Sequence, residues 1–404
     1  MGIKWVTSMG LSMCLLATAG TAWSAEVHGR SSTQFLSFNN ELLTDKRQNE
    51  LAEYLRLSIT NIDKAGKFSI HGYGRGSQDL TAGEGLNGRL YYLYGEYRDL
   101  FDKIDIRAGR QFINLAAGSA IIDGAQFDLK NVGPFAFTAL GGRDVVYSLD
   151  GESGNGDNLV MGLSTYLTGF AKTDLEVSWL RKWDDSDISR DVLGATFKQY
   201  LFNSVRLYSN LRYDLASETF NEVLVGTTYY PTSDLVLTAE YYQSYPTFDT
   251  TSIYSVFAVN RYAEGVFRAD YTINDMFSVN GGYNRQSYGD GGNADVYHAG
   301  AIIRPLDALR LGIEYDKRQG YYGDLDGVMF DATYDYKAAQ LAGGISYDVY
   351  ERDALTGDET ARRYWLGAKY RLAKNMAASG RIQNDVNARY GENVSGRLTF
   401  DYDF

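Results

Sequence analysis

Apolar and polar residues alternate with a period of two in many short segments of this chain. Residues 55–60 read L-R-L-S-I-T, residues 205–212 read V-R-L-Y-S-N-L-R, and residues 309–316 read L-R-L-G-I-E-Y-D. Successive side chains of a strand point to opposite faces, so each segment predicts a strand with one apolar and one polar face. Because the polar face repeatedly carries Arg, Asp and Glu, it indicates a wet surface rather than an ordinary buried core.

The connections between these segments also alternate, a short one followed by a long one. Short turns are expected at 63–66, 102–103, 171–173 and 202–203, whereas 80–87, 141–157, 245–260 and 352–360 are longer and rich in Gly, Asp and Tyr. Short periplasmic turns and longer outer loops are typical of bacterial outer-membrane barrels. With both termini periplasmic the strand number is even, and the segments predict about 22 strands, within a range of roughly 18 to 22. Residues 119–138 and 328–341 each fit either a strand pair or an inward-folded loop.

Composition favours one large barrel over several soluble domains. The chain contains 33 Tyr, 43 Gly and only 4 Pro, with a mean hydropathy of −0.32. No apolar run of about twenty residues follows the N-terminus, which excludes a helical membrane protein. A closed barrel is the other way to satisfy backbone groups in a bilayer, and its alternation keeps the mean hydropathy low. The predicted fold is all-β, a single transmembrane antiparallel up-and-down β-barrel.

The N-terminal segment has the features of a secretory signal peptide. Lys4 gives a short positive region, residues 9–19 are apolar, and small residues lead up to Ala25. The apolar stretch is too short and wrongly flanked for a membrane helix. We therefore predict a signal peptide at residues 1–25 and the barrel at residues 26–404.

The last strand carries a specific signature. Residues 394–404 read V-S-G-R-L-T-F-D-Y-D-F, with Phe400, Tyr402 and Phe404 on one face. A terminal Phe preceded by aromatics two and four residues earlier resembles the C-terminal signature of bacterial outer-membrane β-barrels. The resemblance implies Phe400, Tyr402 and Phe404 as an assembly signal, the barrel-assembly machinery and outer-membrane lipid as partners, and the Gram-negative outer membrane as the location.

Charged residues on the polar face are the candidate pore-lining groups. Two interpretations stand: rings of charge that set ion selectivity in a narrow passage, or paired acids and bases that fill the wall of a wide barrel. The candidates are Arg56, Arg107, Arg206, Arg212, Glu240, Arg310, Glu314, Arg363, Arg371 and Arg397.

Tyrosines gather in pairs at 91–92, 229–230, 241–242 and 321–322. Amphipathic rings settle at the boundary between membrane and water, so we expect aromatic girdles at these places. The alternative is a sugar-stacking surface in the lumen, which requires a line of aromatics on the polar face.

One segment interrupts the strand rhythm. Gly109-Arg110-Gln111 is followed by the small-residue run 118–125, G-S-A-I-I-D-G-A. The run is similar to one seen in several porin families, including alginate-export-type barrels. A constriction loop is the hypothesis here, against an ordinary strand turn, and residues 141–144 are a second candidate for inward folding.

Little in the sequence points to catalysis or to a bound group. Cys14, the single cysteine, lies in the signal segment, so the mature chain has no disulfide, no thiolate metal site and no C-x-x-C-H haem attachment. The three His are far apart, and no hydrolase or phosphate-binding motif is present. The net charge of −12 argues against a nucleic-acid partner. We expect a protein that is not an enzyme and needs no cofactor.

Two functions from different classes follow. The first is a porin that passes ions or small hydrophilic solutes passively through a charged, water-filled lumen, because barrels of sixteen or more strands leave an aqueous channel. The second is a structural sheath that holds a multihaem cytochrome in an outer-membrane electron conduit, with periplasmic and surface multihaem cytochromes as partners.

Overall fold

The computed structural model describes residues 25–40, 46–81, 85–148, 151–153, 158–246, 260–321, 323–353, 357–388 and 391–404. The predicted signal peptide, apart from Ala25, and most of the predicted loop 245–260 lie outside the described residues. Within the described part, no helix is long and apolar enough to cross a membrane.

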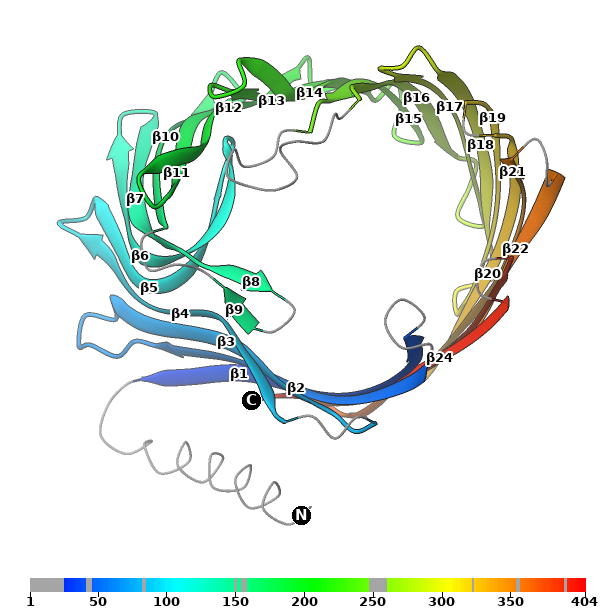
Figure 1. Cartoon of the computed structure of the whole chain (residues 1–404), viewed down its shortest axis with the longest axis horizontal. Helices are drawn as coiled ribbons and strands as arrows, with labels where there is room; N and C mark the ends of the chain where they lie inside the picture. Colours follow the sequence, from blue (N-terminus) through cyan, green and yellow to red (C-terminus); the bar gives the residue numbers. More distant parts are fainter. Residues whose placement is uncertain are drawn as a thin grey trace.

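The chain forms a closed antiparallel barrel. Twenty-two strands of the described residues make one sheet, in which each strand pairs with its neighbours in sequence and the first strand pairs with the last. Figure 1 shows the ring seen along its axis, with two further strands, β8 and β9, forming a separate hairpin inside it. The predicted all-β barrel of about 22 strands is confirmed.

The strands of the first half of the barrel wall are β1 (Glu26–Asn40), β2 (Lys46–Thr60), β3 (Phe68–Asp79), β4 (Asn87–Leu100), β5 (Ile104–Leu115), β6 (Gly118–Val132), β7 (Phe135–Asp144), β10 (Leu159–Phe170), β11 (Thr173–Asp184), β12 (Asp187–Leu201) and β13 (Val205–Asp214). Those of the second half are β14 (Thr219–Tyr229), β15 (Leu235–Ser244), β16 (Tyr262–Thr272), β17 (Phe277–Tyr288), β18 (Asn293–Leu306), β19 (Leu309–Gly320), β20 (Leu325–Tyr336), β21 (Ala339–Asp353), β22 (Gly357–Ala373), β23 (Met376–Asn387) and β24 (Gly391–Asp403). The separate two-stranded hairpin consists of β8 (Val146–Ser148) and β9 (Gly151–Ser153).

Both segments whose character the sequence left open are strand pairs in the wall. Residues 119–138 belong to β6 and to the start of β7, and residues 328–341 belong to β20 and to the start of β21. The first residues of β6, 118–122, are an exception, because they leave the wall and turn into the ring.

The short turns between strands are held by local hydrogen bonds. In the turn between β2 and β3, the Asp63 carboxylate accepts the backbone N–H groups of Lys67 at 2.7 Å and of Phe68 at 2.9 Å. The bond from Phe68 is the main reason why the pKa of the Asp63 carboxyl lies below its usual range. The ionised carboxylate therefore remains available to both donors.

The C-terminal residue closes the barrel against the first strand. Phe404 and Gly29 exchange backbone hydrogen bonds of 2.8 and 2.9 Å, and the Phe404 ring stacks on Tyr402 at 5.8 Å. A Cβ at Gly29 would lie 2.3 Å from the Phe404 ring. The absence of a side chain at Gly29 therefore makes room for the terminal aromatic. The assembly role of Phe400, Tyr402 and Phe404 remains a prediction.

The outer face of the barrel is apolar. Large hydrophobic side chains remain exposed on it around the ring; Leu366 and Leu398, for example, each have 61 % of their surface exposed. Tyr229 and Tyr241 also lie exposed on this face. Exposed apolar area of this extent is unusual for a soluble monomer and is the surface that a bilayer covers.

Two wall strands leave the wall and enter the ring. The pairing of β4 with β5 ends at Leu93 and Arg110, and the pairing of β6 with β7 ends at Ile122 and Asp144. Beyond these positions β5 and β6 pair only with each other, as far as Leu115 and Gly118. We call this segment, residues 110–122, the inner hairpin; Figure 1 shows it (cyan) inside the ring near β11 and β12.

A row of three glycines marks the base of the inner hairpin. Gly109 pairs with Gly124, and Gly124 pairs with Gly142. A Cβ at Gly124 would lie 2.1 Å from the carbonyl oxygen of Gly141, and one at Gly142 would lie 2.6 Å from that of Asp123. Three adjacent strands can therefore approach closely on this face only because no side chain intervenes.

Replacing Gly142 with valine tests this geometry. We expect Gly142→Val to lower the unfolding free energy by about 1–3 kcal/mol, the usual cost of overpacking, measured as the midpoint of the heat-induced loss of barrel structure. Gly265→Val is the matched control, because a Cβ at Gly265 meets no atom within 4 Å. Equal midpoints for the two variants would contradict the role of the glycine row.

Candidate functional site

The tip of the inner hairpin binds the barrel wall through its own peptide groups. The N–H of Ala116 donates to Glu176 Oε1 at 2.7 Å, and the N–H of Ala117 donates to Ser178 Oγ at 2.8 Å. Arg212 Nε donates to the carbonyl oxygen of Ala116 at 2.9 Å. Three side chains from β11 and β13 thus satisfy backbone groups that have no strand partner.

These contacts identify the lumenal face of the wall. Since the hairpin lies inside the ring, the side chains of Glu176, Ser178 and Arg212 point into the lumen. Residues that pair directly across an antiparallel ladder share a face. The strand register therefore extends the assignment around the whole barrel and brings all ten candidate residues to the lumenal face.

Apolar packing fixes the inner hairpin as well. The hairpin side chains that face the wall meet apolar side chains that β7, β10, β11 and β12 direct into the lumen. The members of this cluster are almost fully buried. They are Ile113, Leu115, Ala117, Ala120, Ile122, Leu140, Val160, Leu180 and Val192. The wall beneath the tip is a glycine: a Cβ at Gly194 would lie 2.1 Å from the backbone nitrogen of Ala117.

The prediction that the segment after Gly109 enters the lumen is confirmed. The segment is not a separate constriction loop, because it continues two wall strands past the glycine row. The apolar cluster between this hairpin and the wall was not predicted from the sequence. Leu180 and Val192 break the charged pattern of the lumenal face, and that break is the signal in the sequence.

The prediction that residues 141–144 fold inward is wrong, because they belong to β7 and residues 141–143 pair with β10 in the wall. The element that enters the ring begins just after them. Strands β8 and β9 form a hairpin inside the ring (Figure 1), on the side where β4 has lost its pairing to β5. The Tyr147 hydroxyl donates to the carbonyl oxygen of Leu90, and the Arg89 guanidinium lies 5.5 Å from the centre of the Tyr147 ring. The hairpin therefore covers the part of β4 that the inner hairpin leaves unpaired.

An ion-paired group lies at the base of the inner hairpin, on the face opposite the glycine row. Arg110 binds Asp123 with two hydrogen bonds of 2.7 and 2.8 Å, and Arg143 binds the same carboxylate at 3.0 Å. Two-pronged Arg–carboxylate contacts are geometrically specific. They join β5, β6 and β7 at the level where the strands separate.

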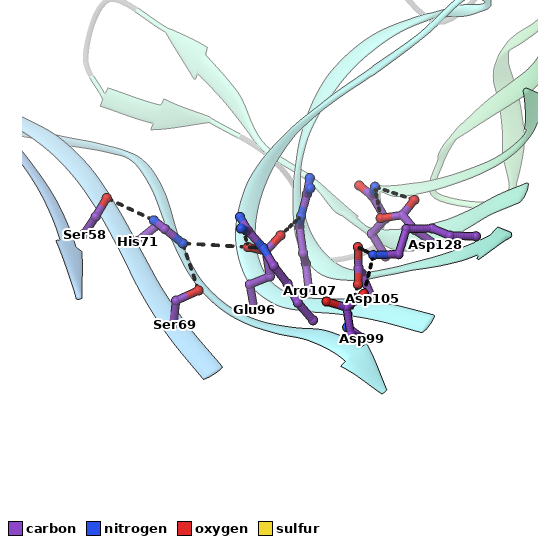
Figure 2. A network of polar contacts seen from close by, with 11 residues as sticks. Ser58, Ser69, His71, Glu96, Asp99, Asp105, Arg107 and Asp128 are labelled. Carbon is purple, nitrogen blue, oxygen red and sulfur yellow. Dashed lines mark hydrogen bonds and ion pairs between the residues drawn. The ribbon is translucent and has the colours of Figure 1, made fainter. Parts of the chain in front are cut away.

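Figure 2 shows a polar network whose labelled residues come from β2 to β6. Glu96 is only 2 % exposed and accepts hydrogen bonds from Arg98 at 2.6 Å and Arg107 at 2.8 Å. His71 contacts two hydroxyls, those of Ser58 at 3.0 Å and Ser69 at 3.1 Å. A buried carboxylate between two guanidiniums is neutralised by them, so Arg107 contributes a paired wall charge.

Three further candidates are paired in the same way. Arg212 binds Glu222 at 2.7 Å, Arg310 binds Asp331 at 2.6 Å, and Arg363 binds Asp385 at 2.6 Å. Together with Arg107, these contacts support the interpretation of paired acids and bases that fill the wall. Of the ten candidates, only Arg212 also touches the inner hairpin among the described residues.

Among the described residues, the remaining candidates form no ion pair on the lumenal face. Arg206 donates to the Thr228 hydroxyl at 3.1 Å and lies over the Tyr208 ring, while the Tyr208 hydroxyl donates to Glu240. Glu314 and Arg56 take their lumenal position from the strand register.

Arg371 and Arg397 belong to a basic patch on β22–β24. We define the patch as Lys369, Arg371, Arg381 and Arg397, four exposed side chains for which no carboxylate of the described residues lies within ion-pair distance. Arg381 and Arg397 are direct cross-strand neighbours, and Arg381 lies 4.5 Å from the centre of the Trp365 ring. Two shallow cavities of about 450 and 320 Å³ open beside these two arginines.

The basic patch lies on the far side of the ring from β11–β13, where the inner hairpin is bound (Figure 1). Across the described residues, no three His, Cys, Asp or Glu side chains are grouped so as to hold a metal ion. Within the described part of the chain, the distinctive features of the lumen are therefore a narrowing on one wall and positive charge without carboxylate partners on another.

Comparisons with known proteins give structural likeness alone. No protein-family model and no curated protein matches the sequence. Among solved structures, Acinetobacter baumannii OccAB2 aligns with a TM-score of 0.49 and 13 % identity over 94 % of this chain and 98 % of that chain. Pseudomonas aeruginosa OccK8 (OprE) aligns with a TM-score of 0.48 and 10 % identity over the same shares. Likeness at this level does not indicate what passes through the barrel.

Removing the side chains that hold the hairpin tip tests the narrowing. In a Glu176→Ala/Ser178→Ala variant, two peptide N–H groups lose acceptors worth about 1–3 kcal/mol each. We expect the tip to leave the wall intermittently, so that single-channel current recorded in a planar bilayer becomes noisier. Thr238→Ala, a lumenal substitution on β15 far from the tip, is the control and is expected to match the wild type. A quiet current in the double variant would contradict the role of these contacts.

Proposed function

We propose that this protein is an outer-membrane porin, a passive channel for ions and small hydrophilic solutes. The observation that carries the proposal is the closed barrel with an apolar outer face and a charged lumen that its own inner hairpin narrows. A barrel of 22 strands has room for an aqueous channel. The inner hairpin narrows this wide lumen, so that the channel can select solutes by size.

Passage through such a lumen is governed by size and by charge. The inner hairpin limits the cross-section, and the bound pairs such as Arg310–Asp331 and Arg363–Asp385 contribute little net field. The basic patch gathers four cations that have no carboxylate partner among the described residues, whereas the other unpaired lumenal charges, Arg56, Arg206, Glu240 and Glu314, are scattered and of both signs. Because a narrow passage with low-dielectric walls focuses the field of fixed charges, the channel should favour anions.

The alternative of a sheath around a multihaem cytochrome finds no support. The inner hairpin and the β8–β9 hairpin both lie inside the ring along one part of its wall (Figure 1) and reduce the space that a cytochrome would need. A sheath also gives no reason for three side chains that hold a hairpin tip against the inner wall.

To act as a channel, the protein must cross the inner membrane and insert into the outer membrane. We propose export by the signal peptide at residues 1–25 and insertion into the outer membrane by the barrel-assembly machinery, which reads Phe400, Tyr402 and Phe404. In support, Phe400 is exposed on the outer face and Phe404 ends the strand that closes the barrel. The channel needs no enzyme activity and no cofactor.

Planar-bilayer recording of the purified protein tests the channel proposal. We expect stable ion conductance with no partner present. A protein that gives no conductance alone, and that copurifies with haem and carries electrons across liposomes only with a cytochrome, would instead be a sheath.

The basic patch makes a separate prediction about selectivity. In a Lys369→Gln/Arg381→Gln/Arg397→Gln variant we expect the reversal potential in a salt gradient to shift toward cation preference, because three unpaired lumenal cations are lost. Arg362→Gln is the matched control. Arg362 lies on β22, as Lys369 does, but it faces outward, because it is the cross-strand neighbour of the outer-face residue Tyr347 on β21. An unchanged reversal potential in the triple variant would show that the patch does not select ions.

A further inference from the structure

Five tyrosine rings form a continuous line along the inner wall beside the two hairpins. In order they are Tyr94, Tyr92, Tyr73, Tyr91 and Tyr147, which we call the tyrosine track. The centres of successive rings lie 5.7, 5.7, 4.9 and 6.1 Å apart. Each ring therefore touches the next, from the body of β4 to the β8–β9 hairpin.

The track faces the lumen. Tyr73 pairs across the ladder with Arg56 and with Tyr92, which places both rings on the lumenal face. Tyr91 lies at a bulge in β4 and stacks on Tyr73, and Tyr147 comes from the hairpin inside the ring. The expectation that Tyr91 and Tyr92 belong to a membrane girdle is thus wrong. All five side chains are partly exposed and accessible to a solute.

Several charges beside the track are paired, whereas Arg56, the cross-strand neighbour of Tyr73, forms no ion pair among the described residues. Arg75 lies 5.6 Å from the ring centre of Tyr54, which stacks on Tyr73, and it forms an ion pair with Glu50. Two residues beyond Tyr94 on β4, Glu96 forms ion pairs with Arg98 and Arg107. The flanks of the track therefore offer hydrogen-bond donors and acceptors of both signs, with fewer unpaired cations than the basic patch gathers.

This combination has a definite chemical preference. The π face of an aromatic ring is negative, so it attracts the weakly positive C–H groups of a flat saturated ring. Paired acids and bases can exchange hydrogen bonds with hydroxyl groups at the edges of that ring. A solute anion would gain more from the basic patch, where positive charge is unpaired.

We propose that the tyrosine track is a binding and guiding surface for neutral oligosaccharides. The inference rests on the channel function and names one class of solute for it. Sugar rings stack in succession on the five tyrosines, and their hydroxyls meet the flanking charged groups. Successive contacts of similar strength let a chain of sugars advance past the inner hairpin without being trapped at one position.

A second group of tyrosines lies across the ring, on β15, β16 and β17 and directly after β19 (Figure 1). The centres of Tyr242, Tyr262, Tyr288 and Tyr321 follow one another at 6.3, 5.4 and 5.1 Å. The strand register puts Tyr242, Tyr262 and Tyr288 on the lumenal face. Two opposed aromatic surfaces suit a sugar chain that enters between them.

The test uses maltohexaose as the probe and two readouts on the purified full-length protein. In a planar bilayer we expect the sugar to interrupt the single-channel current in a concentration-dependent way. Titration calorimetry in detergent reports binding without any need for conductance. We expect Tyr73→Leu to weaken binding about fivefold, as the loss of one aromatic contact would, and Tyr73→Phe to bind as the wild type does.

Two controls separate the explanations. Tyr370→Leu removes an exposed outer-face ring, and Lys369→Gln removes a charge of the basic patch; both should leave sugar binding unchanged. A midpoint of heat-induced unfolding for Tyr73→Leu equal to that of the wild type shows that the barrel is intact. Ion conductance without sugar binding would overturn the track and leave the channel standing. Sugar binding that depends on Tyr73 without conductance would uphold the track and overturn the channel.

Discussion

Backbone hydrogen bonding is the constraint on which the rest of this structure depends. A sheet that closes on itself, with β1 paired to β24, leaves no strand edge exposed to lipid. The inner hairpin violates that closure, because β5 and β6 lose their outer neighbours when they turn into the lumen. The structure compensates locally: Glu176, Ser178 and Arg212 bind the peptide groups at the tip, and the β8–β9 hairpin covers β4.

The turn of the inner hairpin into the lumen depends equally on glycines, which have no side chain. Side chains at Gly124, Gly142 or Gly194 would each meet backbone atoms at 2.6 Å or less. Glycine is entropically costly in a strand, so three of them at the base and beneath the tip of one hairpin mark a place where close approach outweighs that cost. Apolar side chains such as Val160 and Leu180, turned inward against the usual pattern, then form a small core inside an otherwise wet lumen.

Period-two alternation was sufficient to predict the barrel, its strand number and the lumenal face of Arg310, Arg363 and Arg397, since these depend only on local geometry. Partners across strands depend on register, which alternation does not determine. For that reason the pairing of Arg107 with Glu96 could not be predicted, nor could the fact that no described carboxylate pairs with Arg397. Tyr91 and Tyr92 were assigned to a girdle because proximity to a strand end was the sole guide, whereas a bulge in β4 directs both into the lumen.

The lumen thus has three surfaces with different chemistry: a hairpin that narrows it, a basic patch, and a line of tyrosines beside paired charges. The central claim is that the inner hairpin sets the width of the channel. Single-channel conductance of a variant in which residues 112–121 are replaced by an Asn-Gly turn tests it most directly. The account predicts a conductance severalfold above that of the wild type; an unchanged conductance in a correctly folded barrel would contradict it.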